Sequence, residues 1–586
     1  PAQRIEGARL DTLRITSATE GAVIPRLYGR MRIGGNIIWA TDFREETKTT
    51  TQGGGKGGGG GRVQTTEYLY YASFAVALCG GPITGIGRIW ADGKPLDMTG
   101  ITWRWYRGDE TQTPDPFIAA KMGSANTPAY RGTAYVVIKD FPLADYGNRI
   151  PNFTFEVRRT LKKPFDLEDK IKEISLIPGA GEYVYDTVVQ EKTFGQQDVA
   201  GNFVQGGKIT KLNLNNLSNK ADSLVALDNL KATLPNVEYV SVILNWFADS
   251  ADPAVCVIKP GVEFDSQGAR VAPDDWVVAG FTRNTGHPIL EFPDGSPTYG
   301  GTPTDKSIVR LCQELKARGY QVLFYPMLQV DTITPQSKPW RGRITPTTAT
   351  DANNFFTRTN GYNAFINHYA NLNVGGVLLK NTIDAFMIGS ELVGLTTYMS
   401  SPGVFPVVTQ LKSLAASVKS AVGSSVKVIY GGDWSEYHST NGWYHLDPLW
   451  SDSNIDVVAI DCYFPLTPDL PQTQIDYQAI YDGWTQDEGW DYFYTDSVNR
   501  TGLTAYGAPT YAWKNVKHWW TTTHTNPGGG GTAWTPRQKP LWFTELGFPS
   551  VDGCANQPNV FIDPDSIESF YPRGSRGRVD FLAQRT

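Results

Sequence analysis

Four acidic residues of this 586-residue chain each stand directly after an apolar, strand-like run. Glu391 follows FMIGS, Asp433 follows VIYGG, Asp461 follows VVAI and Glu545 follows LWFT. If these runs are neighbouring parallel strands, their ends meet at one edge, and the four carboxyl groups converge on one pocket. A pair of carboxyl groups can do general acid/base work when one is held protonated by burial or a nearby charge while the other stays ionised.

The elements that must position these acids alternate between strand-like and helix-like segments from about residue 166 onward. The strand-like runs are 174–177, 237–246, 321–328, 384–391, 426–434, 456–464 and 540–548. The helix-like stretches are 221–234, 303–319, 352–372 and 406–422. The alternation indicates βαβ units, because a parallel strand pair requires a crossover, and the continuously apolar strands indicate burial on both faces. We therefore predict an (α/β)8 barrel over residues 166–586.

Counting the strands places Glu391 at the end of strand 4 and Glu545 at the end of strand 7. That placement resembles the retaining glycoside hydrolases built on TIM barrels, in which the acid/base follows strand 4 and the nucleophile follows strand 7. The resemblance implies that Glu391 is the acid/base and Glu545 the nucleophile, with carboxyl groups about 5–5.5 Å apart. Those enzymes usually have an asparagine before the acid/base that holds the sugar 2-hydroxyl, whereas this chain has Ser390. Alternatively, both acids are solvated strand-end residues or ion-pair partners.

Further side chains at these strand ends are candidates for contact with a sugar. The candidates are Trp246, Asp433, Trp434, Asp461, Tyr463 and Phe548. Aromatic rings offer a large contact area at low entropy cost, and their faces stack on the CH faces of sugars. The alternative is that the aromatic residues close the barrel end for structural reasons. We expect Arg341 and Arg343, which follow strand 3, to form ion pairs with acids, with lining of the cleft as the alternative.

Composition and motifs exclude several other classes of protein. Lys and Arg number 53 and Asp and Glu number 59, a net charge of -6, whereas proteins dedicated to nucleic acids are basic. The five cysteines form no CxxC, so neither a disulfide framework nor a zinc ribbon is predicted. No HExxH or GxSxG motif is present. His438 and His445 flank a loop that could approach the pocket, but lone histidines are more often structural. We expect no metal and no cofactor.

The first 165 residues read as β-rich, with apolar or alternating runs separated by turn residues. The runs are 24–43, 65–80, 85–97, 101–108 and 133–143. The tract QGGGKGGGGG (52–61) lacks the GxxxxGKS/T pattern of a phosphate-binding loop and predicts a flexible hairpin loop. Residues 68–87 carry no charge and could span a bilayer by length, but their Gly, Pro and Tyr favour two strands and a turn. The predicted fold class is α+β multidomain, with the boundary between residues 165 and 166.

The two predicted domains, in this order, resemble the large tail-tip hub proteins of gene transfer agents and related siphophages. The residues that carry the likeness include EGARLDTLRITSATEGAVIPRLYGRMRIGGNIIWATDF (6–43), AYRGTAYVVIKDFPLADYGNRIPNFTFEV (129–157), DAFMIGSELVGLT (384–396) and KPLWFTELGFPSVD (539–552). The resemblance implies a β-rich tail-hub domain over 1–165 and a glycoside-hydrolase TIM-barrel-like domain over 166–586. DFLAQRT reads as the helix after strand 7, so we expect the barrel to be truncated before its last strand.

This resemblance implies a structural tail-tip or baseplate protein of a phage or gene transfer agent particle. It would close the tail tube, present the barrel to the host envelope, and aid attachment, envelope penetration and DNA delivery. The implied partners are a homotrimer of this chain, the distal tail protein, other tail-tip proteins, the tape measure protein and a host envelope glycan, without sequence-specific nucleic acid. It would assemble in the host cytoplasm and act at the recipient envelope. One alternative is an active retaining glycosidase that cleaves envelope polysaccharide or peptidoglycan glycan. Another, a free cellular glycosidase, is disfavoured by the β-rich first domain.

Overall fold

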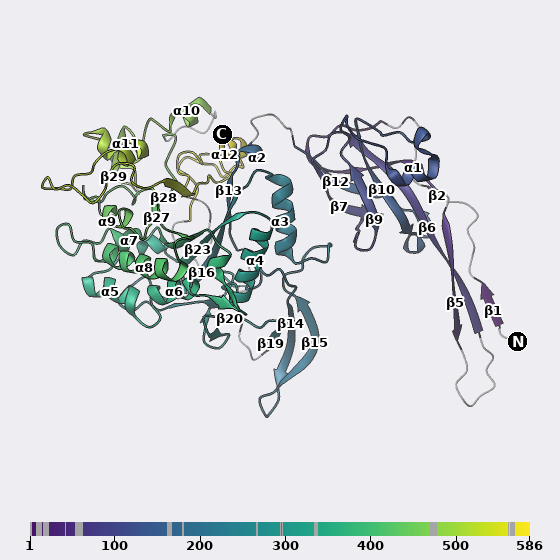
Figure 1. Ribbon diagram of the computed structural model, residues 1–586, viewed down its shortest axis with the longest axis horizontal. Coiled ribbons are helices and arrows are strands. Elements are labelled where there is room, and N and C mark those ends of the chain that lie inside the picture. The colour runs from purple at the N-terminus through teal and green to yellow at the C-terminus, as the bar shows by residue number, and fades with distance from the viewer. Residues whose placement is uncertain are drawn as a thin grey trace. The chain divides into compact units, whose positions relative to one another are not determined.

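The computed structural model describes residues 3–6, 14–15, 21, 23–41, 43–52, 63–160, 167–178, 181–264, 268–292, 295, 297–332, 338–468, 477–497, 499–560, 562 and 569–586. The chain divides into two compact units (Figure 1). The first comprises residues 1–170, 215–220 and 225–235, and the second comprises 171–214, 221–224 and 236–586. The predicted boundary between residues 165 and 166 falls within 161–166, outside the described residues.

The first unit is built from two β-sheets around one apolar core, which confirms the predicted β-rich region. One sheet has the order β1 (Gln3–Glu6), β6 (Val63–Gly80), β10 (Thr133–Pro142), β9 (Thr102–Tyr106), and β4 (Asn36–Ala40) and β5 (Arg44–Gln52) also pair with β6. The other has the order β3 (Gly29–Gly34), β12 (Phe153–Arg159), β7 (Gly85–Ala91), β8 (Lys94–Pro95). The unit also contains β2 (Arg14–Ile15), which pairs with β11 (Arg149–Ile150), and helix α1 (Pro116–Met122). Phe74, Val136 and Phe155 are among the side chains that the two sheets bury together.

Strand β6 is the longest of this unit and forms a hairpin with β5. The antiparallel pairing runs from Arg44 opposite Tyr71 to Gln52 opposite Val63. The strands on either side of the glycine-rich tract are therefore those of a hairpin, although the tract itself lies outside the described residues. The uncharged run 68–87 lies in β6, the turn that follows and the start of β7. In the described part of the chain, no helix combines the length and apolar character needed to cross a membrane.

The core of the second unit is a sheet of parallel strands that neighbour one another in chain order. They are β13 (Glu173–Leu176), β16 (Tyr239–Ala248), β23 (Gln321–Val330), β26 (Ala385–Ser390), β27 (Lys427–Asp433), β28 (Val457–Asp461) and β31 (Leu541–Glu545), at the positions predicted from the sequence. Because side chains alternate along a strand, one face of each strand points inward, and Ile243, Tyr325 and Ile429 share a buried cluster. Trp542 of β31 packs on that cluster and contacts Tyr239 of β16, with ring centroids 6.0 Å apart. The sheet is thus a nearly closed seven-stranded barrel, with β13 and β31 as its end strands.

Helices lie between the barrel strands, before the first of them (α2) and after the last (α12). Their bounds are α2 (Leu167–Lys170), α3 (Asp222–Thr233), α4 (Asp305–Ala317), α5 (Ala349–Thr357), α6 (Tyr362–Ala370), α7 (Val393–Thr396), α8 (Pro406–Val422), α9 (Asp447–Trp450), α10 (Tyr477–Asp482), α11 (Val516–Thr521) and α12 (Phe581–Arg585). Helix α8 has the predicted bounds, because Pro406 is well placed in a first turn and Gly423 follows with a φ of +86°. The single helix predicted over 352–372 is wrong, since α5 and α6 are separate. A side chain at Gly361 would lie 2.8 Å from the Phe355 carbonyl oxygen, so the chain turns there.

The second unit also contains smaller sheets outside the barrel. One has the order β15 (Phe203–Lys211), β14 (Glu191–Gln197), β19 (Ala269–Ala272). Short pairs are β18 (Gly261–Val262) with β22 (His287–Pro288), β20 (Val277–Val278) with β21 (Phe281–Thr282), β24 (Asn373–Val374) with β25 (Val377–Leu378), and β29 (Tyr492–Asp496) with β30 (Thr501–Ala505), and β17 (Ile258–Lys259) pairs with β16.

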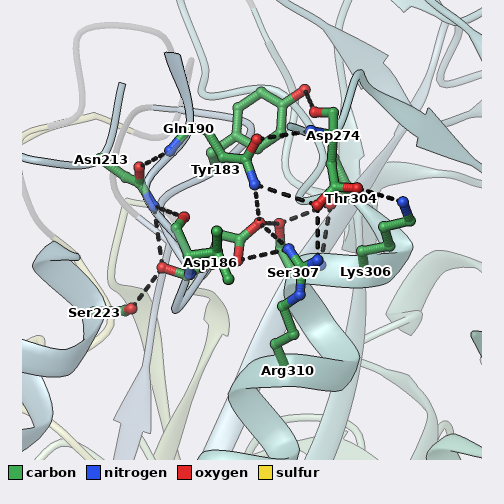
Figure 2. A network of polar contacts seen from close by, with 11 residues as sticks. Tyr183, Asp186, Gln190, Asn213, Ser223, Asp274, Thr304, Lys306, Ser307 and Arg310 are labelled. Carbon is green, nitrogen blue, oxygen red and sulfur yellow. Dashed lines mark hydrogen bonds and ion pairs between the residues drawn. The ribbon is translucent and has the colours of Figure 1, made fainter. Parts of the chain in front are cut away.

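A buried polar network ties the segment after β13 to helix α4 (Figure 2). The fully buried Asp186 carboxylate accepts hydrogen bonds from Arg310 at 3.0 Å, Gln190 at 3.0 Å and Ser307 at 3.2 Å. Arg310 also pairs with Asp274 at 2.7 Å. Removing one partner of a buried ion pair leaves the other charge without compensation, which costs more than the pair contributes. The network therefore fixes α4 against the start of the barrel.

We predict that Asp186→Ala lowers the free energy of unfolding of the second unit by about 3–5 kcal/mol, because Arg310 and its neighbours lose a buried partner. The measurement is denaturant unfolding of the whole chain followed by tryptophan fluorescence. Glu238→Ala is the matched control, since its ion pair with Lys172 is more than half exposed and should contribute about 1 kcal/mol or less. Equal losses in the two variants would contradict a stabilising role for the network.

Two buried histidines lie in the loop region after β27. His438 Nε2 contacts the Thr510 carbonyl oxygen at 2.7 Å, and the His445 ring packs 5.5 Å from that of Phe405. Neither ring nitrogen of His445 has a hydrogen-bond partner. Burial lowers the pKa of each histidine from 6.5 to about 3, because it disfavours the charged imidazolium. Both residues are therefore neutral packing residues, as expected of lone histidines.

Lowering the pH should destabilise the second unit through these histidines. Between pH 6.5 and about 3, each of these histidines is protonated in the unfolded chain but neutral in the folded chain. The free energy of unfolding therefore falls by about 1.4 kcal/mol per pH unit for each histidine. His445→Phe should remove one such contribution from the slope of unfolding free energy against pH. Phe405→Leu, which disturbs the same packing without removing a titrating group, should change stability by a similar amount at every pH. An unchanged slope in His445→Phe would refute this account.

Candidate active site

The four predicted acids gather at the carboxyl end of the barrel strands, and we call them the carboxylate cluster. Glu391 follows β26, while Asp433, Asp461 and Glu545 are the last residues of β27, β28 and β31. Asp461 lies directly opposite Asp433 on one neighbouring strand and Glu545 on the other. Carboxylate oxygens of Glu391, Asp461 and Glu545 lie within 4.8 Å of one another. The strand order and strand ends predicted from the sequence, together with the observed register, therefore bring these acids together.

Glu391 is buried and held from one side by a loop that follows β23. Its Oε2 accepts a hydrogen bond from Trp340 Nε1 at 2.7 Å and forms an ion pair with Arg341 at 2.8 Å. Arg341 also donates to the carbonyl and hydroxyl oxygens of Ser390, both at 2.9 Å. The φ of Glu391 is +50°, a conformation that disfavours side chains, and its N–H donates to the Gly431 carbonyl oxygen at 2.9 Å. The ion pair expected for Arg341 is present, and it fixes both Glu391 and the residue before it.

Glu545 has a different environment, because two tyrosine hydroxyls bond to its two oxygens. Tyr325 donates to Oε1 at 2.6 Å, and Tyr463 donates to Oε2 at 2.8 Å. Two hydroxyl donors stabilise the ionised form of a carboxyl group. Glu545 is also partly exposed, whereas the other members of the cluster are buried. These contacts suit a charged carboxylate that remains accessible.

Asp461 and Asp433 complete the cluster beneath and beside this pair. Asp461 is fully buried; its Oδ1 accepts a hydrogen bond from Thr544 at 2.8 Å, and its Oδ2 has no partner. Burial, then the Glu545 and Glu391 charges, raise the pKa of Asp461 well above its usual range. Burial also raises the pKa of Asp433 to about 6, opposed by hydrogen bonds from Ser435.

The chemistry open to this arrangement follows from the contrast between Glu391 and Glu545. Burial raises the pKa of Glu391 to about 8; Arg341 opposes this shift, and the Glu545 and Asp433 charges add to it. Glu391 therefore keeps its proton at neutral pH and can donate it. Two carboxyl groups of unlike protonation at close range are what retaining glycoside hydrolysis needs, whereas inverting enzymes keep them about 6.5–9.5 Å apart.

The aromatic residues predicted to contact sugar are only partly gathered at this end. Tyr463 bonds to Glu545, and Trp434 is half-buried in edge contact with Phe464, with ring centroids 5.9 Å apart. Phe548 packs on the apolar cluster around Leu466.

Trp246 belongs elsewhere. It is buried between β16 and α6, donates to Tyr369 at 2.9 Å and stacks on Phe365 with centroids 4.9 Å apart. It is next to Asn245 in the strand, so the two side chains point to opposite faces, and Trp246 faces the helices. This corrects its assignment as a sugar contact.

Sequence reasoning missed three residues that shape the site. Tyr325 lies inside an apolar strand, and Trp340 and Thr544 carry no charge that would single them out. The position of Tyr325 could have been found from the sequence. Side chains alternate along a strand, so Tyr325 lies on the same, inner face of β23 as Leu323, inside the barrel. Trp340 has no such signal, since only the folded loop brings its ring nitrogen to Glu391.

The barrel also matches a known domain family. Residues 360–586 match the family described as GTA TIM-barrel-like domain, in which GTA stands for gene transfer agent. A chain from the virion of a native gene transfer agent particle is 43% identical to this one over 30% of this chain and 37% of that chain, with a TM-score of 0.23. This chain thus spans a little over a third of the length of that relative. No curated protein gives a significant match.

Two solved carbohydrate-enzyme structures are also similar to this chain. The GH113 β-mannanase AaManA of Alicyclobacillus acidocaldarius is 14% identical, covering 59% of this chain and 69% of that one with a TM-score of 0.31. The GH53 catalytic domain of Ignisphaera aggregans is 13% identical, covering 68% and 95%, with a TM-score of 0.24. With TM-scores this low, the likeness to these two structures says nothing about the activity of this chain. The expected resemblance to gene transfer agent proteins that carry a TIM-barrel-like domain is confirmed, and it rests on residues 360–586, which match the family of GTA TIM-barrel-like domains.

Proposed function

We propose that this chain is a structural tail protein of a gene transfer agent particle, located at the tail tip as part of the hub. The observation that carries the proposal is the family match over 360–586, together with 43% identity to a chain of such a virion. In this proposal three copies close the tail tube beside the distal tail protein, other tail-tip proteins and the tape measure protein. The barrel then meets an envelope glycan of the recipient cell and aids attachment, penetration and DNA delivery.

The hairpin of the first unit supports a role in assembly. Residues 46–50 of β5 are exposed, and among the described strands β5 pairs with β6 alone. The four-residue strand β1 pairs with β6 from the other side, with Gln3 opposite Val63. The outer edge of β5 therefore presents N–H and C=O groups that no described strand pairs. An open edge of this kind can pair with a neighbouring subunit, which fits a subunit of a ring better than a free enzyme.

Replacing residues 48–67 by an Asn-Gly turn should test this role. Thr47 and Tyr68 are paired in register, so a two-residue turn can close the shortened hairpin. The deletion also removes Val63–Thr66, the residues that pair with β1. We expect the purified variant to keep the cooperative unfolding of the wild type, but particles made with it to lack the tail tip and to transfer no DNA. Glu545→Gln is the matched control and should assemble normally. Normal particles from the shortened variant would contradict the proposed contact.

A second function, retaining glycoside hydrolysis of envelope polysaccharide or peptidoglycan glycan, is favoured by the proximity and unlike protonation of Glu391 and Glu545. In the first step a Glu545 oxygen attacks the anomeric carbon, the glycosidic C–O bond breaks, and Glu391 gives its proton to the leaving oxygen. In the second step Glu391, now a carboxylate beside Arg341, takes a proton from water as that water attacks the anomeric carbon and releases Glu545.

Substitution of the two acids should separate their roles. Glu545→Gln should abolish release of reducing sugar from envelope glycans, and Glu391→Gln should slow it by about 10²–10⁴-fold, because a general acid is lost. In the wild type the rate should fall about tenfold per pH unit above pH 8, the pKa of Glu391, where that acid loses its proton. Glu314→Gln, an acid on α4 that pairs with Arg318, is the control and should retain full activity. Unchanged cleavage in Glu545→Gln would refute the assignment.

A further inference from the structure

Among the residues that the structure describes, the carboxylate cluster holds four acids and faces one base. That base, the Arg341 guanidinium, forms its ion pair with Glu391 and gives two further hydrogen bonds to Ser390. Glu545 is bonded to hydroxyls, which are neutral. Retained protons on Glu391 and Asp461 offset part of the excess of acid, and the negative charge that remains lies in a poorly solvated place, where a positive charge is attracted strongly.

The unsatisfied polar atoms at this end are acceptors. Asp461 is fully buried, lies in the group of three close carboxylates, and has an Oδ2 without a hydrogen-bond partner. Asn245 Oδ1 is also buried without a partner, and this residue lies on the same face of β16 as Ile243, which points into the barrel. A buried acceptor left without a donor destabilises the folded chain, and Asp461 offsets this by keeping a proton when no ligand is bound. A cation rich in hydrogen-bond donors would replace that proton and complete this end.

The three carboxyl groups lie close enough together to share an ammonium group. An ammonium nitrogen that donates hydrogen bonds of about 2.8 Å to three acceptors holds them about 4.6 Å apart. The oxygens of Glu391, Asp461 and Glu545 lie no more than 4.8 Å from one another, a limit that includes this spacing. Since a carboxyl group that holds its proton still has an acceptor oxygen, all three can bond to one such group.

A metal ion fits the same oxygens less well. Calcium takes about 6–8 oxygen ligands, whereas Trp340 and Arg341 already bond to Glu391 and two tyrosines bond to Glu545. The guanidinium of Arg341 would also repel a second full charge of the metal at close range, and an ammonium carries only one. The observations therefore favour an organic cation.

We propose that the carboxylate cluster recognises the ammonium group of an amino sugar, so that the substrate of the barrel is a glycan containing glucosamine units with a free amine. The proposal rests on the glycosidase function proposed above. An amine on the carbon next to the anomeric carbon lies beside both the attacked position and the leaving oxygen, as Glu391 and Glu545 do. Asp461, which takes no part in the bond-breaking steps, then acts as the specificity residue through its Oδ2.

Binding of monosaccharides to the full chain tests the proposal, because these probes have no glycosidic bond to cleave. Titration calorimetry would compare D-glucosamine with N-acetyl-D-glucosamine, which has the same ring but no positive charge. We expect glucosamine to bind at least tenfold more tightly. Asp461→Asn keeps the shape of the side chain and should reduce that preference to threefold or less, whereas Glu314→Gln should leave it intact.

The outcomes distinguish this proposal from the glycosidase function itself. Equal affinity for the two sugars, or tighter binding of the acetylated one, would overturn the amino-sugar proposal, even if neutral glycans were cleaved. A preference for glucosamine without cleavage of chitosan by the wild type would leave the recognition intact and remove the proposed hydrolysis. Displacement of glucosamine by micromolar calcium would also overturn it, in favour of a metal site. The comparison of the two sugars needs no variant, so it decides the matter even if Asp461→Asn fails to fold.

Discussion

Removing four carboxyl groups from water at one end of a barrel has a large free-energy cost, and the construction of this end follows from it. The cost cannot be avoided, because parallel register sets Asp433, Asp461 and Glu545 side by side on neighbouring strands. One guanidinium, two tyrosine hydroxyls and retained protons offset it. Two of these have a consequence for chemistry: the proton makes Glu391 an acid, and the hydroxyls hold both oxygens of Glu545. The same burial that destabilises the folded chain thus separates two identical side chains into different roles.

Comparison with the network at α4 shows what an evenly matched set of charges looks like in the same unit. There Asp186 and Asp274 face Arg310 and Lys306, and Gln190 and Ser307 supply further donors (Figure 2). Such a network stabilises the contact between the elements, and its charged groups already have partners, so it offers little to a ligand. The carboxylate cluster has four acids to one base and acceptors without donors. Since a stable fold gains nothing from that imbalance, the imbalance points to binding or catalysis.

The sequence was sufficient to predict the barrel, because its strands are continuously apolar and four of them, β26, β27, β28 and β31, end in or are followed by an acid that breaks the pattern. Glu391 and Glu545 could be placed together from strand order alone, without any knowledge of loops. The orientation of Trp246 could not be predicted from the sequence. A shift of one residue in the register of a strand moves each of its side chains to the opposite face, so a residue near the end of a strand can point into the barrel or toward the helices. The break between α5 and α6 lies at Gly361, which packs closely against Phe355 and Arg358 a few residues earlier in the chain. The Asn-Gly pair at 360–361 is a local turn signal that the prediction of one helix over 352–372 overlooked. The contact of Trp340 with Glu391, in contrast, arises only in the folded loop.

Ser390 connects the departure seen in the sequence with the chemistry of the site. Its carbonyl and hydroxyl oxygens both accept from Arg341, so a residue expected to present a polar group to a sugar instead anchors the base that neutralises Glu391. An asparagine there would offer an amide donor to a sugar hydroxyl, whereas the Ser390 hydroxyl bonds to Arg341 and has one O–H of its own to donate. The unpartnered oxygens of Asp461 and Asn245 add acceptors at the inner end of the barrel. A ligand that fits this end must supply hydrogen-bond donors of its own, and a cationic ligand also compensates the excess of carboxyl groups.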